Sequence, residues 1–216
     1  MKRALLAAAL LSCAAAGFAF DPEYIHPRLG LMIITNVVTG DVGAPDAVVN
    51  TFGASLDFPF EKNPRWSFQP GVDIYWTRYE WGSDERAHPT EMETAQAALV
   101  LGAILDAPVF YTWDFSESLQ GMVGGGGAVI LRAAFRASGS DSDTPVSEIG
   151  SWFYKKLRWF YPSTQFKLAY RLQEKFTFEF SARWFVPLFN VLDPEAPSFF
   201  DHSMIDLTLG MRIKLR

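Results

Sequence analysis

The sequence is poor in the side chains that build disulfides and metal centres. It has one cysteine, Cys13, and three histidines, His26, His88 and His202. A single cysteine excludes a disulfide framework, so the stability of the fold must come from other interactions. The histidines lie far apart in sequence without the spacing of a metal site, and each is expected to be a solvated loop or rim residue. We therefore expect no metal and no other cofactor.

The sequence also lacks an excess of positive charge and any long apolar run beyond its N-terminus. Its formal net charge is −5, whereas binding to a nucleic acid requires a basic surface. After residue 20, no stretch reaches the ~18 consecutive apolar residues of a transmembrane helix. These two deficits argue against a nucleic-acid partner and a helical membrane span, so any crossing of a bilayer would have to be made by strands.

Residues 1–19 have the composition of a secretory signal peptide. Lys2 and Arg3 form a short positive segment, residues 4–16 carry no charge, and small residues precede a cleavage site expected after Ala19. The segment is too short and wrongly flanked for a transmembrane helix. A lipoprotein signal is the alternative, because residues 10–13 resemble a lipobox that ends at Cys13. Residues 20–216 are expected to form one β domain.

The C-terminal segment, residues 204–216, alternates most clearly between apolar and polar side chains. Apolar residues occupy the odd positions from Ile205 to Leu215, and polar residues or glycine occupy the even positions from Asp206 to Lys214. Successive side chains of a strand point to opposite faces, so this segment predicts a strand with one apolar and one charged face. Such a strand suits a sheet in water or a barrel in a membrane.

Seven further segments have the composition of strands, most of them with the same alternation. The predicted strands are 28–38, 50–60, 65–79, 94–109, 119–135, 165–172, 176–186 and 204–216. Pro70 removes a hydrogen-bond donor from the third strand and predicts a bulge or a bend there. The alanine-rich residues 91–105 also permit a helix.

The glycine run 124–127 lies within the fifth predicted strand. In a small barrel these glycines leave room for bulky neighbours that point into the lumen. A nucleotide-binding loop is the functional alternative, but no Lys-Ser or Lys-Thr pair follows the run and no helical pattern begins after it. We therefore retain the strand.

The connections between the predicted strands alternate in length. Residues 61–64, 110–118 and 173–175 are the short ones, and residues 39–49, 80–93, 136–161 and 187–201 are the long ones. Short periplasmic turns and long outer loops produce this rhythm in outer-membrane barrels. The predicted fold is therefore all-β, an eight-stranded antiparallel up-and-down transmembrane β-barrel with both termini on the periplasmic side.

Aromatic residues are abundant, at 15% of the chain. Tryptophan and tyrosine favour the membrane interface, because their rings are apolar and their N–H or O–H groups bind water. The tryptophans predicted to form two girdles at the ends of the strands are Trp66, Trp76, Trp81, Trp113, Trp159 and Trp184.

If the apolar faces of the strands contact lipid, the opposite faces bring acids and bases into the lumen. The predicted lumen charge network consists of Asp57, Asp73, Asp106, Arg132, Lys167, Arg171, Glu179, Arg183, Asp206, Arg212 and Lys214. An eight-stranded barrel is only wide enough for side chains to fill it. We therefore expect a closed, ion-paired interior and keep a selective channel or a ligand pocket as the alternative.

The last strand also contains a motif that resembles the terminal assembly signal of outer-membrane barrels. The residues that carry the resemblance are Thr208, Gly210, Ile213 and Leu215. With the signal peptide, the strand count and the loop rhythm, they make the chain similar to the small outer-membrane barrels typified by OmpX, the OmpA transmembrane domain and OmpW. The resemblance implies location in the bacterial outer membrane and contact with outer-membrane lipid and the barrel-assembly machinery.

The function expected from this resemblance is structural, or a surface interaction in which the extracellular loops bind an external ligand. A narrow OmpW-like conduit for small hydrophobic molecules is one alternative. A soluble periplasmic lipid-binding barrel is another, because alternation alone does not say which face is inside.

Enzymatic activity is not expected from the sequence. Some barrels of this class are lipid-modifying enzymes with a serine, a histidine and an acid at the outer rim, and the candidates here are Ser203, His202 and either Asp201 or His88. Adjacent strand residues point to opposite faces, so His202 and Ser203 cannot easily meet as base and nucleophile.

The third long loop is distinctive for its aromatic and basic residues. As a helix, residues 147–160 would be amphipathic, and such a helix would suit the headgroup layer or cover the mouth of the barrel. The alternative is a loop that folds onto the ends of its own strands.

Overall fold

The chain folds mainly into β-strands. The computed structural model describes residues 22–37, 46–90, 97–136, 144–173, 175–193 and 196–215. Its strands are β1 (Tyr24–Ile34), β2 (Ala47–Phe60), β3 (Asn63–Phe68), β4 (Gly71–Trp81), β5 (Ala87–Thr90), β6 (Ala97–Asp106), β7 (Val109–Asp114), β8 (Leu119–Arg136), β9 (Phe160–Arg171), β10 (Phe176–Phe185) and β11 (Met204–Lys214). Three short helical elements accompany them: α2 (Thr144–Tyr154), η1 (Lys155–Leu157) and α3 (Phe189–Leu192). The predicted signal peptide, with Cys13, lies outside the described residues.

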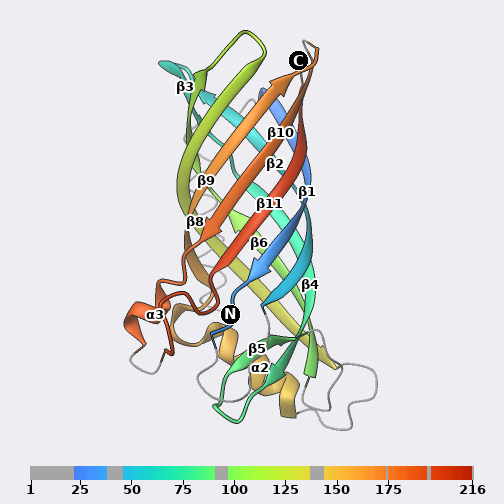
Figure 1. Ribbon diagram of the computed structural model, residues 1–216, viewed down its shortest axis with the longest axis vertical. Helices are drawn as coiled ribbons and strands as arrows, with labels where there is room; N and C mark the ends of the chain where they lie inside the picture. Colours follow the sequence, from blue (N-terminus) through green and yellow to red (C-terminus); the bar gives the residue numbers. More distant parts are fainter. Residues whose placement is uncertain are drawn as a thin grey trace.

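The long strands of the described chain close into a ring. The order around the ring is β1, β2, β4, β6, β8, β9, β10 and β11, and β11 pairs again with β1 (Figure 1). Every pairing is antiparallel. The predicted all-β, eight-stranded up-and-down barrel is confirmed.

Two of the ring strands continue past a break that contains a proline. β3 leads into β4 across residues 69–70, and β6 leads into β7 across residues 107–108. Pro70 and Pro108 lack the N–H that a continuous ladder needs, which accounts for the breaks. At Pro70, where a bulge or a bend was predicted, the strand is interrupted at residues 69–70. The connection predicted for residues 110–118 is shorter in the structure, residues 115–118, because β7 extends the strand to Asp114.

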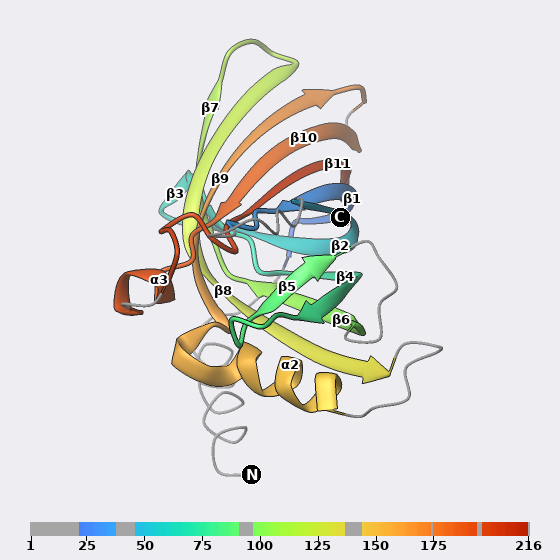
Figure 2. The same cartoon turned by 60° about the horizontal axis from the view of Figure 1, so that its bottom comes forward.

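The two ends of the barrel differ in the length of their connections. We call the end with the connections 61–62, 115–118 and 172–175 the turn end, where Tyr24 of β1 pairs with Lys214 of β11. The opposite end, which we call the loop end, carries α2, α3 and β5 (Figures 1 and 2). The helix predicted for the third loop is α2, and the helix proposed for residues 91–105 is a strand over its described part, because β6 begins at Ala97.

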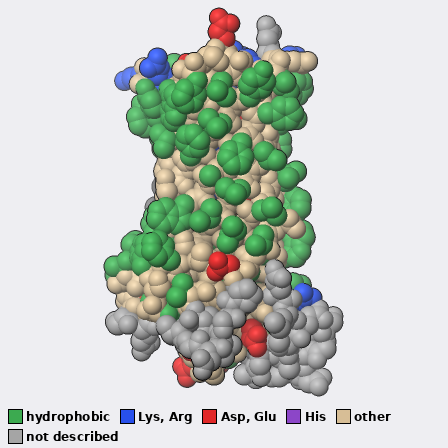
Figure 3. Space-filling view, viewed as in Figure 1, with side chains coloured by type: hydrophobic (Ala, Val, Ile, Leu, Met, Phe, Trp, Pro, Cys, Tyr) green, Lys and Arg blue, Asp and Glu red, His purple; other side chains and the backbone are tan. Residues whose placement is uncertain are grey.

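The outer wall of the barrel is apolar. Exposed apolar side chains occupy the outward positions of the strands, including Leu29, Ile74, Leu101, Phe180 and Leu209. On the face seen in Figure 3, hydrophobic side chains cover the middle of the molecule, and the charged groups lie toward its two ends. In the described part of the chain, no helix has the length and hydropathy needed to cross a membrane.

Candidate functional site

Two arginines and three aspartates form a buried cluster inside the barrel, which we call the central network (Arg28, Asp73, Asp106, Arg183 and Asp206). Arg28 donates from Nε and one terminal nitrogen to the two oxygens of Asp73, at 2.8 and 2.7 Å. Arg183 donates to Asp73 at 2.6 Å and, through its other terminal nitrogen, to Asp206. Asp106 lies 3.7 Å from Arg28 and 3.6 Å from Arg183. Each charge faces an opposite charge, which offsets the desolvation that burial imposes.

Neutral side chains from other strands complete the central network. Thr51 on β2 donates its hydroxyl to Asp206 at 3.0 Å, and Gln165 on β9 donates to Asp106 at 2.8 Å. Gly53 on β2 faces the Asp73 side chain so closely that an added Cβ would overlap it. The network thus joins β1, β2, β4, β6, β9, β10 and β11 from within the barrel.

A second charged group lies toward the turn end and is centred on His26. Its Nδ1 donates to Glu179 at 2.7 Å, and its Nε2 lies 3.7 Å from Asp57. Arg212 approaches Glu179 at 3.9 Å on the other side. The prediction of a solvated His26 was wrong. β1 begins at Tyr24, before the predicted position 28, and this places residue 26 on the inward face.

The neighbouring lysine of the lumen has a neutral partner. Lys167 is buried and donates to Gln69 at 2.6 Å, and its ammonium lies 4.3 Å from the centre of the Phe110 ring. The ring fits there because Gly124 carries no side chain, and an added Cβ would approach Phe110 to 2.6 Å. This contact gives a physical role to the first glycine of the run 124–127.

Between the central network and the loop end, the interior becomes apolar. The buried residues of this layer are Met32, Ile34, Ala47, Val49, Tyr75, Ile104, Ala128, Ile130, Tyr161, Phe185, Phe189 and Met204. Arg132 lies at its edge and donates to the hydroxyl oxygens of Tyr75 at 2.8 Å and Tyr161 at 3.4 Å. Its guanidinium also lies 4.9 Å from the centre of the Phe153 ring. Arg132 was predicted in the acid–base network, but its guanidinium donates to tyrosine hydroxyls, the Met204 sulfur and the backbone carbonyl of Arg158.

The helix α2 covers this apolar layer at the loop end. Ile149, Trp152 and Phe153 are buried against Tyr79 of β4 and small residues of β6. The Phe153 ring meets Tyr79 edge-on, with centroids 4.9 Å apart. We call α2 and the residues packed against it the cover. A helix of the third loop that covers the mouth of the barrel was one of the arrangements considered from the sequence.

His202 is part of the cover. Its ring lies 4.7 Å from that of Trp152 and stacks on Tyr79 at 6.5 Å. Burial holds the pKa of His202 well below its ordinary value, and the nearby Arg86 guanidinium acts in the same direction. The prediction of a solvated His202 was wrong, because its ring packs against Trp152 of α2 and Tyr79 of β4. His88, in contrast, lies at the rim, between Asp84 and Asn36.

The residues considered as a catalytic set have separate partners. Asp201 binds Arg86 and accepts from the backbone N–H of Val37 at 2.9 Å. Burial raises the pKa of Asp201. Ser203 accepts a hydrogen bond from the indole N–H of Trp184 at 2.7 Å. His202 Nε2 lies 3.6 Å from the Asp201 carboxylate, so the acid and the base of the set are adjacent. The Ser203 hydroxyl faces Trp184 instead.

Two residues of the predicted charge network lie outside the interior. Arg171 is exposed at the end of β9, and Lys214 is exposed at the end of β11, 3.7 Å from Glu23. Both strands end at these residues, so their side chains reach water at the turn end. The remaining predicted members, Asp57, Asp73, Asp106, Arg132, Lys167, Glu179, Arg183, Asp206 and Arg212, line the interior.

Two of the six tryptophans expected in the girdles occupy other positions. Trp76 lies in the middle of β4, where it stacks on Phe52 at 5.7 Å. Trp81 packs against the cover, because the odd-numbered residues of β4 point inward. The other four lie near the ends of the barrel: Trp66 and Trp113 at the turn end, and Trp159 and Trp184 at the loop end.

The residues of the predicted assembly signal occupy both faces of β11. Thr208 points inward to the Ser181 hydroxyl, and Gly210 pairs with Arg28 and Glu179. Ile213 and Leu215 lie at the turn end of the strand. Their recognition by an assembly factor stays a prediction.

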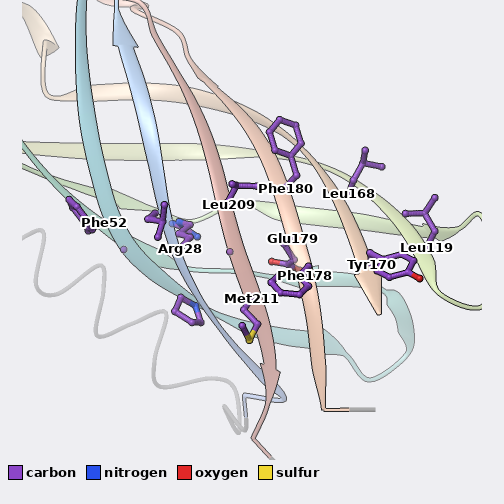
Figure 4. A pocket seen from close by; sticks show the side chains of 14 residues that line it. Arg28, Phe52, Leu119, Leu168, Tyr170, Phe178, Glu179, Phe180, Leu209 and Met211 are labelled. Atoms are coloured by element: carbon purple, nitrogen blue, oxygen red, sulfur yellow. The ribbon is translucent and has the colours of Figure 1, made fainter. Parts of the chain in front are cut away.

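A hollow of about 720 Å³ is lined by residues of β1, β2, β8, β9, β10 and β11 (Figure 4). Phe52, Tyr170, Phe180 and Leu209 in its lining are exposed side chains of the outer wall. The hollow therefore offers mainly apolar surface. Among the residues that the structure describes, no group of three or more histidine, cysteine or acidic side chains could hold a metal ion.

The closed ring, with its apolar wall and charged interior, has the fold of the small outer-membrane β-barrel proteins. The crystal structure of Neisserial surface protein A (NspA) matches with a TM-score of 0.53 and 11% identity, over 89% of this chain and 96% of NspA. Ail of Yersinia pestis matches with a TM-score of 0.43 and 11% identity, over 90% and 100% of the two chains. No protein-family model matches the chain, and no curated protein does.

The expectation that the chain is not an enzyme is corrected by a third structure. The outer membrane enzyme PagL matches with a TM-score of 0.42 and 9% identity, over 89% of this chain and 99% of PagL. A fold does not by itself decide whether a protein is an enzyme, so the fold gives no ground for excluding activity.

Proposed function

We propose that the chain is an integral protein of the bacterial outer membrane, with a structural or surface-interaction role carried by the loop end. The observation that carries this proposal is the partition of side chains across the closed sheet. Outward residues such as Leu209, 62% exposed, are apolar, while the inward charges are buried. An apolar wall of this extent would be a liability in water and suits contact with lipid.

The filled interior favours this role over the two alternatives. A conduit requires a continuous path, whereas the central network and the cover occupy the lumen in succession. A soluble lipid-binding barrel requires an apolar inner face, whereas the inner face here carries Arg183, Asp73 and Asp206. The closed barrel leaves the loop end as the surface available to an extracellular ligand.

The orientation of the barrel and its remaining partners follow from the proposed location in the outer membrane. Short connections face the periplasm in outer-membrane barrels, so the loop end with α2 faces outward. Insertion by the barrel-assembly machinery would use the terminal motif of β11, from Thr208 to Leu215. Residues 1–19 would direct export, and residues 20–216 would form the barrel domain.

Labelling of single cysteines in intact cells tests both the location and the orientation. In a Cys13→Ser background, Ser83→Cys places a thiol in an exposed turn at the loop end, and Lys62→Cys places a matched thiol at the turn end. A membrane-impermeant maleimide should label Ser83→Cys in intact cells and Lys62→Cys only after the outer membrane is permeabilised. Labelling of both variants only after permeabilisation would contradict the proposal.

A further inference from the structure

The single helical turn α3 at the loop end has one anchored side. Phe189 is buried and packs edge-on against Tyr161, with ring centroids 5.5 Å apart. Asn190 donates to the backbone carbonyl of Phe199 at 3.2 Å. Asp193, directly after the turn, binds Arg158 at 3.0 Å. These contacts fix the orientation of α3 against the barrel.

The other side of α3 is apolar and strongly exposed. Leu188 is 43% exposed, Val191 64% and Leu192 65%. Leu157 of η1, which is 50% exposed, lies next to α3, because Lys156 binds Asp193 at 2.8 Å. Large apolar groups held in water by a fixed backbone indicate a contact surface. We call Leu157, Leu188, Val191 and Leu192 the lateral patch.

The lateral patch continues the apolar outer wall of the barrel. α3 follows β10 closely in the chain and projects sideways from the barrel, not along its axis (Figures 1 and 2). Phe160, the first residue of β9, is 36% exposed and follows η1 closely in the chain. The exposed Lys155 adds a cation beside the patch, as expected where a protein meets lipid phosphates.

We propose that the lateral patch inserts into the outer leaflet, at the boundary between acyl chains and headgroups. The exposed side of α3 then lies in the membrane, and the surface left for an extracellular ligand is that of the cover and the β4–β5 turn. The occupant of the patch is lipid, because the patch is continuous with the lipid-facing wall. This inference rests on the proposed membrane location of the barrel.

Depth-dependent fluorescence quenching tests the proposal. Three single-cysteine variants are made in the Cys13→Ser background: Val191→Cys in the patch, Leu209→Cys on the outer wall and Ser83→Cys in the exposed turn. Each is labelled with an environment-sensitive dye, reconstituted in phosphatidylcholine vesicles, and checked for a heat-dependent gel shift. Bromines at shallow and at deep acyl positions then serve as quenchers. Leu192→Cys replaces Val191→Cys if the latter does not give a folded barrel.

The proposal expects strong quenching of the patch variant, with shallow bromines more effective than deep ones. Leu209→Cys should be quenched best by deep bromines, and Ser83→Cys should lose no fluorescence. If Leu209→Cys is quenched while the patch variant behaves like Ser83→Cys, the lateral inference is overturned and the membrane barrel stands. A patch dye shielded from aqueous iodide but insensitive to bromines would indicate protein contact and also overturn it. If Leu209→Cys itself escapes quenching, the proposed function fails.

Discussion

Replacement of Arg183 by methionine removes a buried cation that holds two carboxylates of the central network. Arg183 is 1% exposed and binds both Asp73 and Asp206. Methionine has a similar length and no charge, so the change leaves the interior filled while it deletes the ion pairs. The effect should therefore be electrostatic.

The two carboxylates lose unequal amounts of support. Asp73 keeps two hydrogen bonds from Arg28, whereas Asp206 keeps the hydrogen bond from the Thr51 hydroxyl. Removal of one partner from a buried ion pair costs about 3–5 kcal/mol, because the other charge stays desolvated. We expect Arg183→Met to lower the free energy of unfolding by about 3 kcal/mol at neutral pH. Adding Asp206→Asn should restore part of this loss, because it removes the unpaired charge.

Urea titration of the folded barrel in lipid vesicles, followed by tryptophan fluorescence, measures these free energies. Three variants are compared with the unmodified chain: Arg183→Met, Asp206→Asn and the double variant. The reasoning is refuted if Arg183→Met is less than about 1 kcal/mol destabilised. It is also refuted if the double variant is less stable than Arg183→Met.

Three further predictions concern the wall, the interior and the cover. Leu209→Arg places a charge on the lipid face and should lower the stability of the inserted barrel by about 2–4 kcal/mol near the bilayer midplane. Arg212→Leu should impair insertion less. The reverse order in a vesicle-insertion assay would invert the assignment of faces. Gly102→Ala would place a Cβ on the Tyr75 ring and should lower stability by about 1–3 kcal/mol, and an unchanged denaturation midpoint would contradict this. The cover should loosen as the pH falls below about 6.5, because the imidazole of His202 takes up a proton in the unfolded state but stays neutral while it is buried. The free energy that holds the cover closed should fall by up to about 1.4 kcal/mol per pH unit. Hydrogen exchange of α2, corrected for its intrinsic pH dependence, should lose this sensitivity in His202→Asn, and persistence of the full effect would exclude His202 as its source.

The alternation of side chains predicted most of the barrel from the sequence. The hairpin of β9 and β10 illustrates why: its inward residues Lys167, Glu179 and Arg183 are polar, while Phe178 and Phe180 point outward. Since side chains alternate with a period of two, polarity identifies the two faces wherever they differ.

The same reasoning failed where both faces of a strand are apolar. The predicted strand 28–38 is apolar on both faces over its middle, so Arg28 was not assigned to the interior, although it is a hub of the central network. Inward Met32 and Ile34 lie in the apolar layer and resemble outward residues in sequence. Alternation carries no information about a lumen that is itself apolar, and the layer beneath the cover was therefore missed.

The contacts of the long loops depend on tertiary structure that local patterns do not encode. The amphipathic character of the third loop indicated a helix, but not the positions of its ends. Leu157 and Phe160 belong to the segment 147–160 that was considered as one helix, but they lie beyond the end of α2 and are exposed. The burial of His202 arises from the return of a second loop beneath α2, which links residues distant in sequence.

Membrane fractionation of the full-length protein, followed by gel mobility with and without boiling, tests the central claim most directly. A closed barrel with an apolar wall should appear in the outer-membrane fraction and resist detergent until it is heated, and so shift in mobility on boiling. A soluble periplasmic protein without a heat-dependent shift would contradict the account, because the apolar wall would then have no lipid to contact.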